Sequence, residues 1–448
     1  MLKEDISLTI KKQSEFFKTG QSMDVDFRIA SLKKIRKLII DYLDRLYDAL
    51  WKDLHKPEFE SHAGEVGIAL QEIDVQLRGV RKWSRPKRVH TPLLHFYSRS
   101  YIYTEPMGKV LIFSPWNFPF QLSFVPLIGA VAAGNCVVLK PSQHTPHTSS
   151  VMEEMIRRNF DPGYIAFFPG GKNINQALLD EKFDYIFFTG SQKVGRIVME
   201  TASRNLTPVS LELGGKNPCI VDNTASINFA AKRITWGKFF NAGQSCVAPD
   251  YLLVHKEIKE KLLQGITGNI YRFYGQDPQS SPDYPRIGNV ATAERLAHLI
   301  QNGKVVTGGK TDISERYVAP TILDEVRPDE AIMEEEIFGP VLPVITYSDM
   351  EEAIQLINTK PQPLACYIFT NKPGIQKNLL RRISFGTASV NDTVVQFINP
   401  NLPFGGVGES GIGRYHGRKS FDTFTNFKSV MKKTNLFDIS LRYPPYSG

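Results

Sequence analysis

The stretch Tyr185-Ile-Phe-Phe-Thr-Gly-Ser-Gln-Lys-Val-Gly195 decides the fold class of this chain. Its first half is a short apolar run typical of a buried strand, and its second half opens a helical pattern over 193–204. A turn from a buried strand into a helix presents free backbone N–H groups and the positive end of the helix dipole, which together can bind a phosphate. A plain strand-to-helix turn explains the same residues, so support must come from the rest of the chain.

Strand-like and helix-like segments alternate on both sides of this stretch. Before it, strand-like runs at 110–113, 136–139 and 165–168 are separated by helical patterns at 120–133, 147–159 and 173–180. After it, strands are predicted near 217–221, 251–254, 364–369 and 386–390, and helices near 225–240, 256–273, 291–302 and 350–357. The order predicts an α/β protein with two doubly wound parallel-sheet domains and a small extra piece.

Length and composition agree with a globular protein of more than one domain. The chain has 448 residues, too many for a single core, of which 42% are hydrophobic and 22% charged. The longest apolar stretch, 122–139, is interrupted by Pro126 and Gly134, so we expect a buried helix ending at Gly134 rather than a membrane span. With a charged start and no hydrophobic tail, the expectation is a cytoplasmic protein without a membrane anchor.

Charge and cysteine usage exclude some classes of function. The net charge of +8 includes basic clusters at 33–37 and 78–88, which we interpret as solvated surface because no nucleic-acid-binding motif accompanies them. We therefore expect no nucleic-acid partner. Four widely spaced cysteines without a CxxC pair indicate a reducing compartment and argue against disulfides and a metal site.

One cysteine differs from the other three in its surroundings. Cys136, Cys219 and Cys366 lie in apolar strand-like runs, where a free cysteine usually acts as a small buried hydrophobe. Cys246 instead follows the turn-prone residues 241–245 and is followed by Pro249. A thiol in such a loop can be reached by a substrate and activated as a nucleophile, although a structural role is the ordinary alternative.

Lys140 marks a second turn at the same predicted sheet edge as the Gly190 turn. It ends the strand 136–139, and the carboxyl ends of parallel strands face one crevice. In the first turn, Gly190 allows close backbone approach, Ser191 can donate a hydrogen bond, and Gly195 lets the helix pack tightly on the sheet. Two such turns on one sheet are compatible with a dinucleotide site.

Three further segments carry side chains suited to chemistry beside a cysteine. Asn117 is held between two prolines in Ser114-Pro-Trp-Asn-Phe-Pro119, and Glu336 lies beside an aromatic residue in Glu335-Glu-Ile-Phe-Gly-Pro340. Glu212 lies among leucines and glycines, where desolvation would raise its pKa toward that of a useful base. Taken singly, Asn117 could be a turn former and Glu212 a buried ion-pair partner.

Together and in order, these motifs resemble the NAD(P)-dependent aldehyde dehydrogenase superfamily over essentially the whole chain. The matching motifs are Ser-Pro-Trp-Asn-Phe-Pro, Lys-Pro-Ser, Phe-Thr-Gly-Ser-x-x-Val-Gly, Leu-Glu-Leu-Gly-Gly-Lys, Gly-Gln-x-Cys, Glu-Glu-Ile-Phe-Gly-Pro and Pro403-Phe-Gly-Gly-Val-Gly. The segments Gln244–Tyr251 and Tyr415-His416-Gly417 look like the class 3 branch, which includes fatty and aromatic aldehyde dehydrogenases and is typically dimeric.

The resemblance implies a role for each motif. Cys246 would attack the aldehyde carbon, the Asn117 amide and the Cys246 N–H would stabilise the oxyanion, and Glu212 would activate water to hydrolyse the resulting thioester. For the cofactor NAD, the resemblance implies that Lys140 and Glu336 hold the riboses, Phe338 packs near the nicotinamide and the 190–195 turn covers the pyrophosphate. The implied cofactor-binding set is Trp116, Lys140, Gly190, Ser191, Val194, Gly195, Glu336 and Phe338.

The resemblance also implies a division into domains and an assembly. Residues 1–84 and 106–209 would form the NAD(P)-binding domain, 210–420 the catalytic domain, and 85–105 with 421–448 a small β bridging segment that mediates a homodimer. One position departs from the family: Gln143 stands where a glutamate is frequent, and a neutral amide would not repel the 2′-phosphate of NADP. We therefore expect NADP to be accepted alongside NAD.

The substrate is an aldehyde on this resemblance, and two other functions stay open. Trp116, Phe118, Phe120, Phe397 and Ile398 would give an apolar tunnel suited to medium- or long-chain aliphatic or aromatic aldehydes. A CoA-acylating enzyme is one alternative, although its relatives generally lack the glutamate found at 212. A catalytically idle structural or binding relative is the other, although such a role does not require Cys246, Glu212 and Asn117 together.

Overall fold

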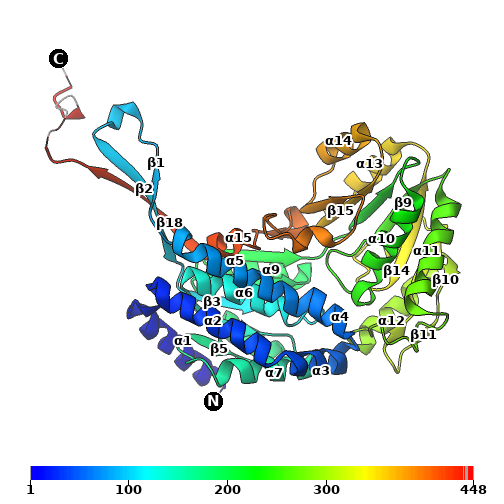
Figure 1. Ribbon diagram of the computed structural model, residues 1–448, viewed down its shortest axis with the longest axis horizontal. Coiled ribbons are helices and arrows are strands. Elements are labelled where there is room, and N and C mark those ends of the chain that lie inside the picture. The colour runs from blue at the N-terminus through cyan, green and yellow to red at the C-terminus, as the bar shows by residue number, and fades with distance from the viewer. Residues whose placement is uncertain (1, 437, 439–441, 447–448) are drawn as a thin grey trace.

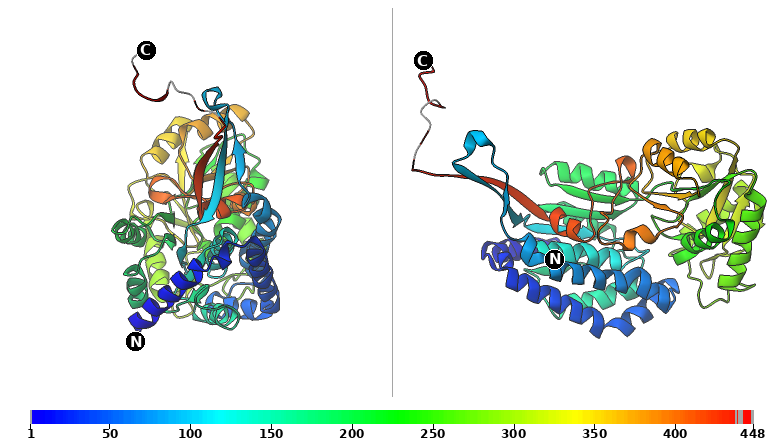
Figure 2. Two further views of the ribbon diagram at one scale, coloured as in Figure 1. Left: turned by 90° about the vertical axis from the view of Figure 1, so that its left-hand side faces the viewer. Right: turned by 45° about the horizontal axis from the view of Figure 1, so that its top comes forward.

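The computed structural model describes residues 2–436, 438 and 442–446 (Figure 1). Two α/β units lie side by side, and a narrow antiparallel arm projects from the first unit on the side away from the second (Figures 1 and 2). In the described part of the chain, one unit is built on a six-stranded sheet, the other on a seven-stranded sheet, and the arm on three strands. The predicted α/β class with two parallel-sheet units and a small β piece is therefore confirmed.

The six-stranded sheet has the order β17-β7-β6-β3-β4-β5, in which β17 is antiparallel to β7 and the other neighbours are parallel. Alternate residues of each strand face opposite layers of helices, so both faces are buried. In β3, for example, Val110 and Ile112 join one core cluster while Leu111 and Phe113 join the other. The strands are β3 (Lys109–Phe113), β4 (Cys136–Lys140), β5 (Ile165–Phe167), β6 (Tyr185–Gly190), β7 (Val209–Leu213) and β17 (Gly411–Ile412).

Two layers of helices cover this sheet. The helix α6 (Gln121–Ala133) is buried along its whole length and ends, as predicted, at Gly134, whose φ of 97° lies in the left-handed region. The other helices of this unit are α1 (Leu2–Lys18), α2 (Val25–Asp41), α3 (Leu43–Leu54), α4 (Glu58–Ser61), α5 (Gly67–Trp83), α7 (Pro146–Arg157), α8 (Lys172–Leu179), α9 (Gln192–Ser203) and α15 (Arg418–Thr423). Between α4 and α5 lies a short π-helical segment, His62–Val66.

The seven-stranded sheet has the order β10-β13-β14-β9-β8-β15-β16, with β10 antiparallel to β13 and the remaining neighbours parallel. Its strands are β8 (Pro218–Val221), β9 (Tyr251–His255), β10 (Lys304–Thr307), β13 (Thr321–Asp324), β14 (Val341–Tyr347), β15 (Ala365–Phe369) and β16 (Thr387–Val390). The helices of this unit are α10 (Ile227–Phe239), α11 (Lys259–Tyr274), α12 (Val290–Leu299), α13 (Met350–Asn358) and α14 (Pro373–Arg382), and a small ribbon pairs β11 (Thr311–Asp312) with β12 (Tyr317–Val318).

The strand β14 was not predicted from the sequence. It lies between β13 and β9 in the sheet, yet it carries Pro343 in the middle of Val341-Leu-Pro-Val-Ile-Thr-Tyr347. A proline has no N–H to donate to a sheet ladder and normally argues against an interior strand. Here Pro343 is the last residue of β14 in the ladder with β13, and the pairing with β9 begins at Val344, so the ladder accommodates the missing donor.

The projecting arm contains β1 (Lys87–Val89), β2 (Ser98–Pro106) and β18 (Thr425–Lys433) in the order β1-β2-β18. The two parts of the predicted bridging segment, 85–105 and 421–448, thus pair through β2 and β18, with Thr425 opposite Pro106 and Lys433 opposite Ser98. Among the described residues, no strand pairs with the other edge of β18. Residues 437, 439–441 and 447–448 of the predicted bridging segment lie outside the described residues.

The sheets divide the chain slightly differently from the predicted domain boundary at 209/210. Strand β7 continues to Leu213 within the first sheet, and β17 joins the same sheet from much later in the chain. The domain boundaries themselves stay a prediction. In the part of the chain that the structure describes, every helix is too short or too polar to span a bilayer.

Candidate active site

Four of the predicted site segments lie at the carboxyl ends of parallel strands of the six-stranded sheet. The segment with Trp116 and Asn117 follows β3, Lys140 ends β4, the Gly190 turn ends β6, and Glu212 lies in β7. Since these strands are neighbours in the sheet, the segments meet at one edge. Cys246 and Glu336 approach this edge from loops of the second unit, so the site lies between the two units.

The loop that carries Cys246 has an unusual backbone conformation. After α10, the three consecutive residues Asn241, Ala242 and Gly243 have φ values of 53°, 51° and 72°. Such left-handed residues cost about 1–2 kcal/mol each for residues other than glycine, so the surroundings must hold them in place. The Asn241 N–H donates to the carboxylate of Glu60 at 2.9 Å, and burial raises the pKa of Glu60 to about 8.

Asn117 is tied directly to this loop. Its side-chain Nδ2 donates to the carbonyl of Gln244 at 3.1 Å, and its own carbonyl accepts a hydrogen bond from the Asn241 side chain at 3.0 Å. The Asn117 carbonyl also accepts from Lys56 Nζ at 2.9 Å. The predicted oxyanion residue and the predicted nucleophile loop are therefore held together by hydrogen bonds between segments far apart in the sequence.

A buried ion pair holds the Asn117 segment from the other side. Lys56 Nζ lies 2.6 Å from Glu65 Oε1, and both side chains are completely buried. The other oxygen of Glu65 accepts hydrogen bonds from the N–H groups of Phe120 and Gln121 at 2.9 Å, at the start of α6. Neither Lys56 nor Glu65 was singled out from the sequence, because both acquire their roles through contacts with the distant segment 117–121.

Asn217 fixes the other end of the Cys246 loop. Its Nδ2 donates to the carbonyls of Cys246 at 2.7 Å and Ala248 at 3.0 Å, while its Oδ1 accepts from the N–H of Ala365 at 2.8 Å. The Asn217 amide thus joins the Cys246 loop to β15 through both its nitrogen and its oxygen. The sequence contained a hint, since Asn217 directly follows the Leu-Glu-Leu-Gly-Gly-Lys motif, but nothing in it indicated the contact with Cys246.

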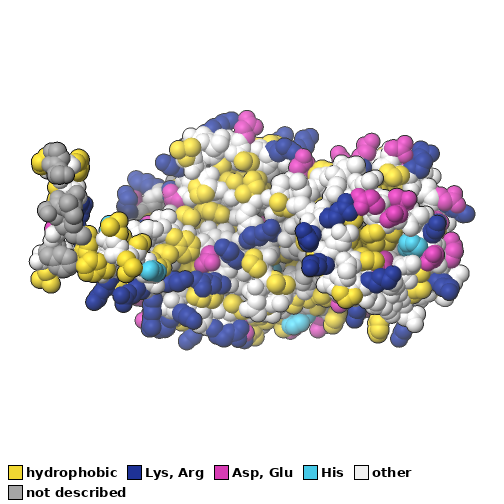
Figure 3. Space-filling view, turned by 90° about the horizontal axis from the view of Figure 1, so that it is seen from above, with side chains coloured by type: hydrophobic (Ala, Val, Ile, Leu, Met, Phe, Trp, Pro, Cys, Tyr) yellow, Lys and Arg dark blue, Asp and Glu magenta, His cyan; other side chains and the backbone are white. Residues whose placement is uncertain are grey.

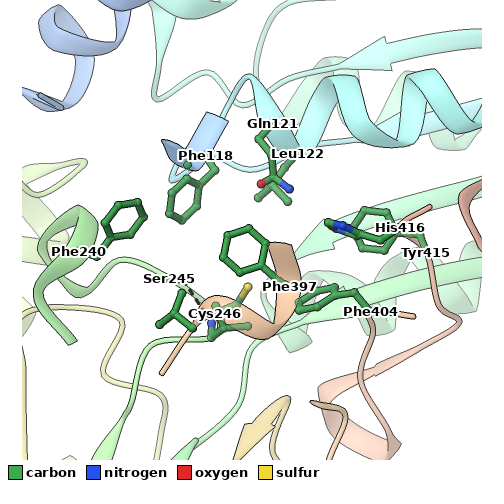
Figure 4. A pocket seen from close by; sticks show the side chains of 13 residues that line it. Phe118, Gln121, Leu122, Phe240, Ser245, Cys246, Phe397, Phe404, Tyr415 and His416 are labelled. Atoms are coloured by element: carbon green, nitrogen blue, oxygen red, sulfur yellow. Dashed lines mark hydrogen bonds between the residues drawn. The ribbon is translucent and has the colours of Figure 1, made fainter. Parts of the chain in front are cut away.

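Cys246 lies between two cavities. One cavity of about 240 Å³ is lined by most of the predicted site: Trp116, Asn117, Gly190, Ser191, Glu212, Cys246, Glu336 and Phe338. The other is a narrow cavity of about 30 Å³ on the opposite side of the thiol, with mainly aromatic and aliphatic walls that include Phe118, Phe240 and Phe397 (Figure 4). Cys246 is partly exposed, whereas Cys136, Cys219 and Cys366 are buried as predicted.

Glu212 is a buried carboxylate without a hydrogen-bond partner. Its side chain lines the larger cavity, and among the described residues neither of its oxygens has a hydrogen-bond partner. Burial raises the pKa of Glu212 well above its usual value, with a smaller opposing effect from Arg414. The expected direction of this shift is confirmed, and a carboxyl group in this state can take up a proton at neutral pH.

The Cys246 thiol is not poised as a thiolate in this environment. Burial raises its pKa, and the neighbouring carboxyl groups of Glu336 and Glu212 raise it further. The N–H groups of Cys246 and Val247 act in the opposite direction but do not overcome burial. The role of Cys246 as the nucleophile stays a prediction, and these surroundings disfavour its thiolate form.

Glu336 and Phe338 close the larger cavity from the second unit. A Cβ atom on Gly214 would lie only 1.8 Å from the Glu336 carboxylate, so a side chain there would displace that carboxylate, and burial raises the pKa of Glu336 to about 8. The segment is anchored because the Ile337 N–H donates to Asp250, which is paired with the buried Lys216. The ring of Phe338 lies edge-on to Trp116, with 5.6 Å between ring centroids.

Of the predicted cofactor residues, Lys140, Val194 and Gly195 do not line this cavity. Lys140 is buried, donates to the carbonyl of Pro141 at 2.7 Å, and has its pKa lowered to about 8 by desolvation. Ser191 caps α9 by accepting a hydrogen bond from the Val194 N–H at 3.4 Å, and Val194 is 40% exposed. Gly195 is packed against Leu213, where a Cβ atom would approach to 2.7 Å.

Comparison with known proteins agrees with this geometry. The family model described as "Aldehyde dehydrogenase family" matches residues 1–430. The 4,4′-diaponeurosporen-aldehyde dehydrogenase of Staphylococcus aureus is 48% identical over 435 residues, which cover 97% of this chain and 95% of that protein. Human aldehyde dehydrogenase family 3 member B1 is 45% identical over 445 residues, covering 98% and 94% of the two chains.

The chain belongs to the aldehyde dehydrogenase family. As a member, it is an oxidoreductase that converts aldehydes to carboxylic acids. The solved structure of Staphylococcus aureus AldH in a substrate-bound state superimposes on this dehydrogenase with a TM-score of 0.97, at 47% identity, covering 99% of this chain and 97% of that one. A NAD-dependent aldehyde dehydrogenase from Sinorhizobium meliloti gives a TM-score of 0.88 at 29% identity, with coverages of 98% and 88%.

The Asn217→Ala variant of this aldehyde dehydrogenase should lose turnover without losing its fold. The substitution leaves the carbonyls of Cys246 and Ala248 without their donor, and a loop displaced by about 1 Å can lower turnover on the order of 10²-fold. Steady-state kinetics should show a fall in kcat while cofactor affinity is unchanged. The matched control is Asn223→Ala, which removes only an exposed contact with Glu257. Equal kcat values for the two variants would show that Asn217 does not position the thiol.

Proposed function

We propose that Cys246 is the nucleophile of this aldehyde dehydrogenase, that Asn117 stabilises the oxyanion, and that Glu212 is the base that activates the hydrolytic water. The observation that carries the proposal is the buried Glu212 carboxylate, which has no hydrogen-bond partner in the described residues and lines the same cavity as Cys246. Desolvation without a partner destabilises the charged form of a carboxylate by several kcal/mol. Groups perturbed in this way are concentrated at functional sites.

The first step is attack of the Cys246 sulfur on the aldehyde carbon. As the S–C bond forms, the carbonyl π electrons move to oxygen and the thiol proton passes to solvent. Asn117 uses one N–H of its amide to bind Gln244, which leaves the second N–H available for the oxyanion together with the Cys246 backbone N–H. Each such donor contributes about 3 kcal/mol in comparable sites.

The second step releases the acid. After the aldehyde carbon has lost its hydride, Cys246 carries a thioester. Glu212 removes a proton from water as the water oxygen bonds to the acyl carbon. The S–C bond then breaks, and the sulfur takes up the proton held by Glu212, which returns the thiol and releases the free acid. A base for water is needed for hydrolysis but not for transfer to the thiol of CoA, so Glu212 favours hydrolysis over the CoA-acylating alternative.

The larger cavity and the turns beside it fit a nicotinamide dinucleotide, as in the Sinorhizobium meliloti relative that is named NAD-dependent. When bound, NAD accepts the hydride that leaves the aldehyde carbon. Trp116, Glu336 and Phe338 would hold the nicotinamide half, while Lys140, which is buried with a backbone carbonyl as its acceptor, would hold the other ribose. The turn from Gly190 through Ser191 and Val194 to Gly195, at the start of α9, would receive the pyrophosphate.

We propose that NADP is accepted as well. Gln143 is exposed three residues beyond Lys140, and its amide lies against Gly171, where an added Cβ atom would be 2.0 Å from Oε1. The neutral amide therefore lies next to the glycine loop that leads into α8, near the expected position of the adenosine ribose. A carboxylate at this position would repel the 2′-phosphate of NADP, and the amide does not.

The substrate side fits a predominantly apolar aldehyde. Phe118 and Phe397 line the narrow cavity beside Cys246, as the proposed tunnel requires. Of the other predicted lining residues, Trp116 faces the cofactor cavity, Phe120 packs on Phe124 in the core, and Ile398 is on the surface. Medium- and long-chain aliphatic and aromatic aldehydes are the proposed substrates.

We propose that residues 1–84 and 106–209 bind the cofactor, that 210–420 supply the catalytic side, and that 85–105 with 421–448 mediate a homodimer in the cytoplasm. The support for the dimer is the arm, whose outer strand β18 has one edge unpaired among the described residues. Phe427 and Met431 on this strand are 46% and 50% exposed, and apolar side chains cover much of the arm in Figure 3. An unprotected edge with apolar side chains is suited to a second subunit.

The Glu212→Gln variant tests the reaction sequence. It should give one NADH per active site in a rapid burst, followed by turnover about 10²-fold or more below wild type, because hydrolysis loses its base. Stopped-flow absorbance with hexanal or benzaldehyde measures both phases, and Cys246→Ala should show no burst. Loss of burst and steady-state rates by the same factor would contradict the assignment of Glu212. Acyl-CoA instead of free acid, formed when CoA is added to wild type, would contradict hydrolysis.

The Gln143→Glu variant tests the cofactor proposal. Its carboxylate should lower kcat/KM for NADP about 10-fold relative to NAD, which corresponds to about 1.4 kcal/mol of repulsion. Gln301→Glu, an exposed residue of the second unit, adds the same charge far from the site and should leave the ratio unchanged. An NADP/NAD ratio in Gln143→Glu equal to that of wild type would remove the basis for the proposal.

The dimer proposal is tested by mass in solution. Light scattering after size exclusion should give twice the 50.6 kDa chain mass. The double variant Phe427→Glu with Met431→Glu should elute as a monomer, because two carboxylates would then lie on the covered face of β18. Phe229→Glu, at a residue that is 60% exposed on the second unit, is the control and should stay dimeric. A monomeric wild type, or a dimer that withstands the double variant, would contradict the proposed interface.

A further inference from the structure

Two polar side chains face the narrow cavity beside Cys246, and the proposed reaction uses neither. Gln121 and His416 are each only 5% exposed, and both line this cavity. Their main-chain N–H groups are hydrogen-bonded, but among the described residues neither side chain has a hydrogen-bond partner. Figure 4 shows the ends of both side chains directed toward the same part of the cavity.

The other walls of this cavity offer few polar groups. They are formed largely by Phe118, Leu122, Phe240, Val247, Val394, Phe397 and Phe404. The side chains of Gln121 and His416 line this mainly apolar cavity without a hydrogen-bond partner among the described residues. A ligand that brings its own hydrogen-bonding group into the cavity would supply one.

The backbones of both residues are held in place by hydrogen bonds to other segments. Gln121 is the first residue of α6, and its N–H donates to the buried Glu65 carboxylate at 2.9 Å. His416 has a left-handed φ of 74°, its N–H donates to Ser420 Oγ at 3.0 Å, and its ring packs 4.4 Å from the ring of Tyr415. The next N–H, of Gly417, donates to Glu72 at 2.9 Å. A strained backbone held by such contacts is typical of functional positions.

The charge state of the two groups limits what they can bind. Burial lowers the pKa of His416 to about 4, so its imidazole is neutral at physiological pH, with one nitrogen able to donate and the other to accept. The Gln121 amide is also neutral and can donate or accept. Neither group supplies the positive charge that an anionic substrate would need, whereas an uncharged oxygen can bond to both.

We propose that Gln121 and His416 are specificity-determining residues that hydrogen-bond an uncharged oxygen on the carbon skeleton of the aldehyde. The preferred substrates are then apolar aldehydes that carry a hydroxyl or carbonyl oxygen beyond the reacting carbon. This inference rests on the proposed function, because it places the aldehyde in the cavity on the Phe397 side of Cys246. Sites with buried hydrogen-bonding groups discriminate strongly against analogues that lack the partner atom.

Matched substrate pairs test the proposal. The first pair is trans-2-nonenal and 4-hydroxy-trans-2-nonenal, whose trans double bond prevents the hydroxyl from closing onto the aldehyde. The second is benzaldehyde with 3- and 4-hydroxybenzaldehyde. For each pair, the measurement is the ratio of kcat/KM for the hydroxylated member to that for the parent.

The variants are Gln121→Leu and His416→Phe, which keep the shape of the side chain and remove its hydrogen-bonding atoms. For at least one pair, each variant should lower the hydroxyl-to-parent ratio about 10-fold or more relative to wild type. Gln176→Leu, an exposed residue of α8, is the control and should leave the ratio unchanged. Variants that change both members of every pair by the same factor would overturn the proposal.

A binding measurement separates this inference from the proposed reaction. On the Cys246→Ala background, the dissociation constants of benzaldehyde and its hydroxylated analogues can be measured by tryptophan fluorescence without turnover. The hydroxyl preference should be present there and be lost when His416→Phe or Gln121→Leu is added. Absence of turnover in wild type with this preference intact would overturn only the proposed function. Turnover in wild type without any variant-dependent preference would overturn only the inference.

Discussion

The buried ion pair between Lys56 and Glu65 is the interaction on which the active-site geometry depends. Lys56 binds the carbonyl of Asn117, and Glu65 binds the first N–H groups of α6, so one pair fixes the residues on both sides of the loop. Removing one partner of such a pair leaves an uncompensated buried charge and typically destabilises a protein by about 3–5 kcal/mol. Here the same loss would also weaken the attachment of Asn117 to the Cys246 loop and leave Gln121 less firmly placed in the wall of the narrow cavity.

Cys246 lines two cavities that differ in polarity. The larger cavity holds the carboxyl groups of Glu212 and Glu336, while the narrow one is mainly apolar. Burial and the two carboxyl groups raise the pKa of the Cys246 thiol, so its surroundings disfavour the thiolate. A thiol is less prone to oxidation than a thiolate, which is an advantage for a partly exposed cysteine.

Long-range hydrogen bonds, rather than neighbours in the chain, place the reacting groups. Asn117 and Gln244 are 127 residues apart, and Asn217 and Ala365 are 148 residues apart, yet each pair is joined directly. The Asn117–Gln244 bond crosses between the two α/β units, so formation of the site depends on the packing of the units. The left-handed residues 241–243 are tolerable only because that packing is complete.

The sequence by itself determined the α/β class, the order of most strands and helices, the end of α6 at Gly134, and the contrast between Cys246 and the three buried cysteines. These features depend on local periodicity, turn residues and the order of motifs, all of which are visible in the amino-acid sequence. Only the tertiary structure decided that β14 is an interior strand despite Pro343, that Phe120 packs in the core, and that Cys246 lines two cavities. It also revealed Lys56, Asn217 and His416, because burial and partners depend on contacts that no local pattern contains.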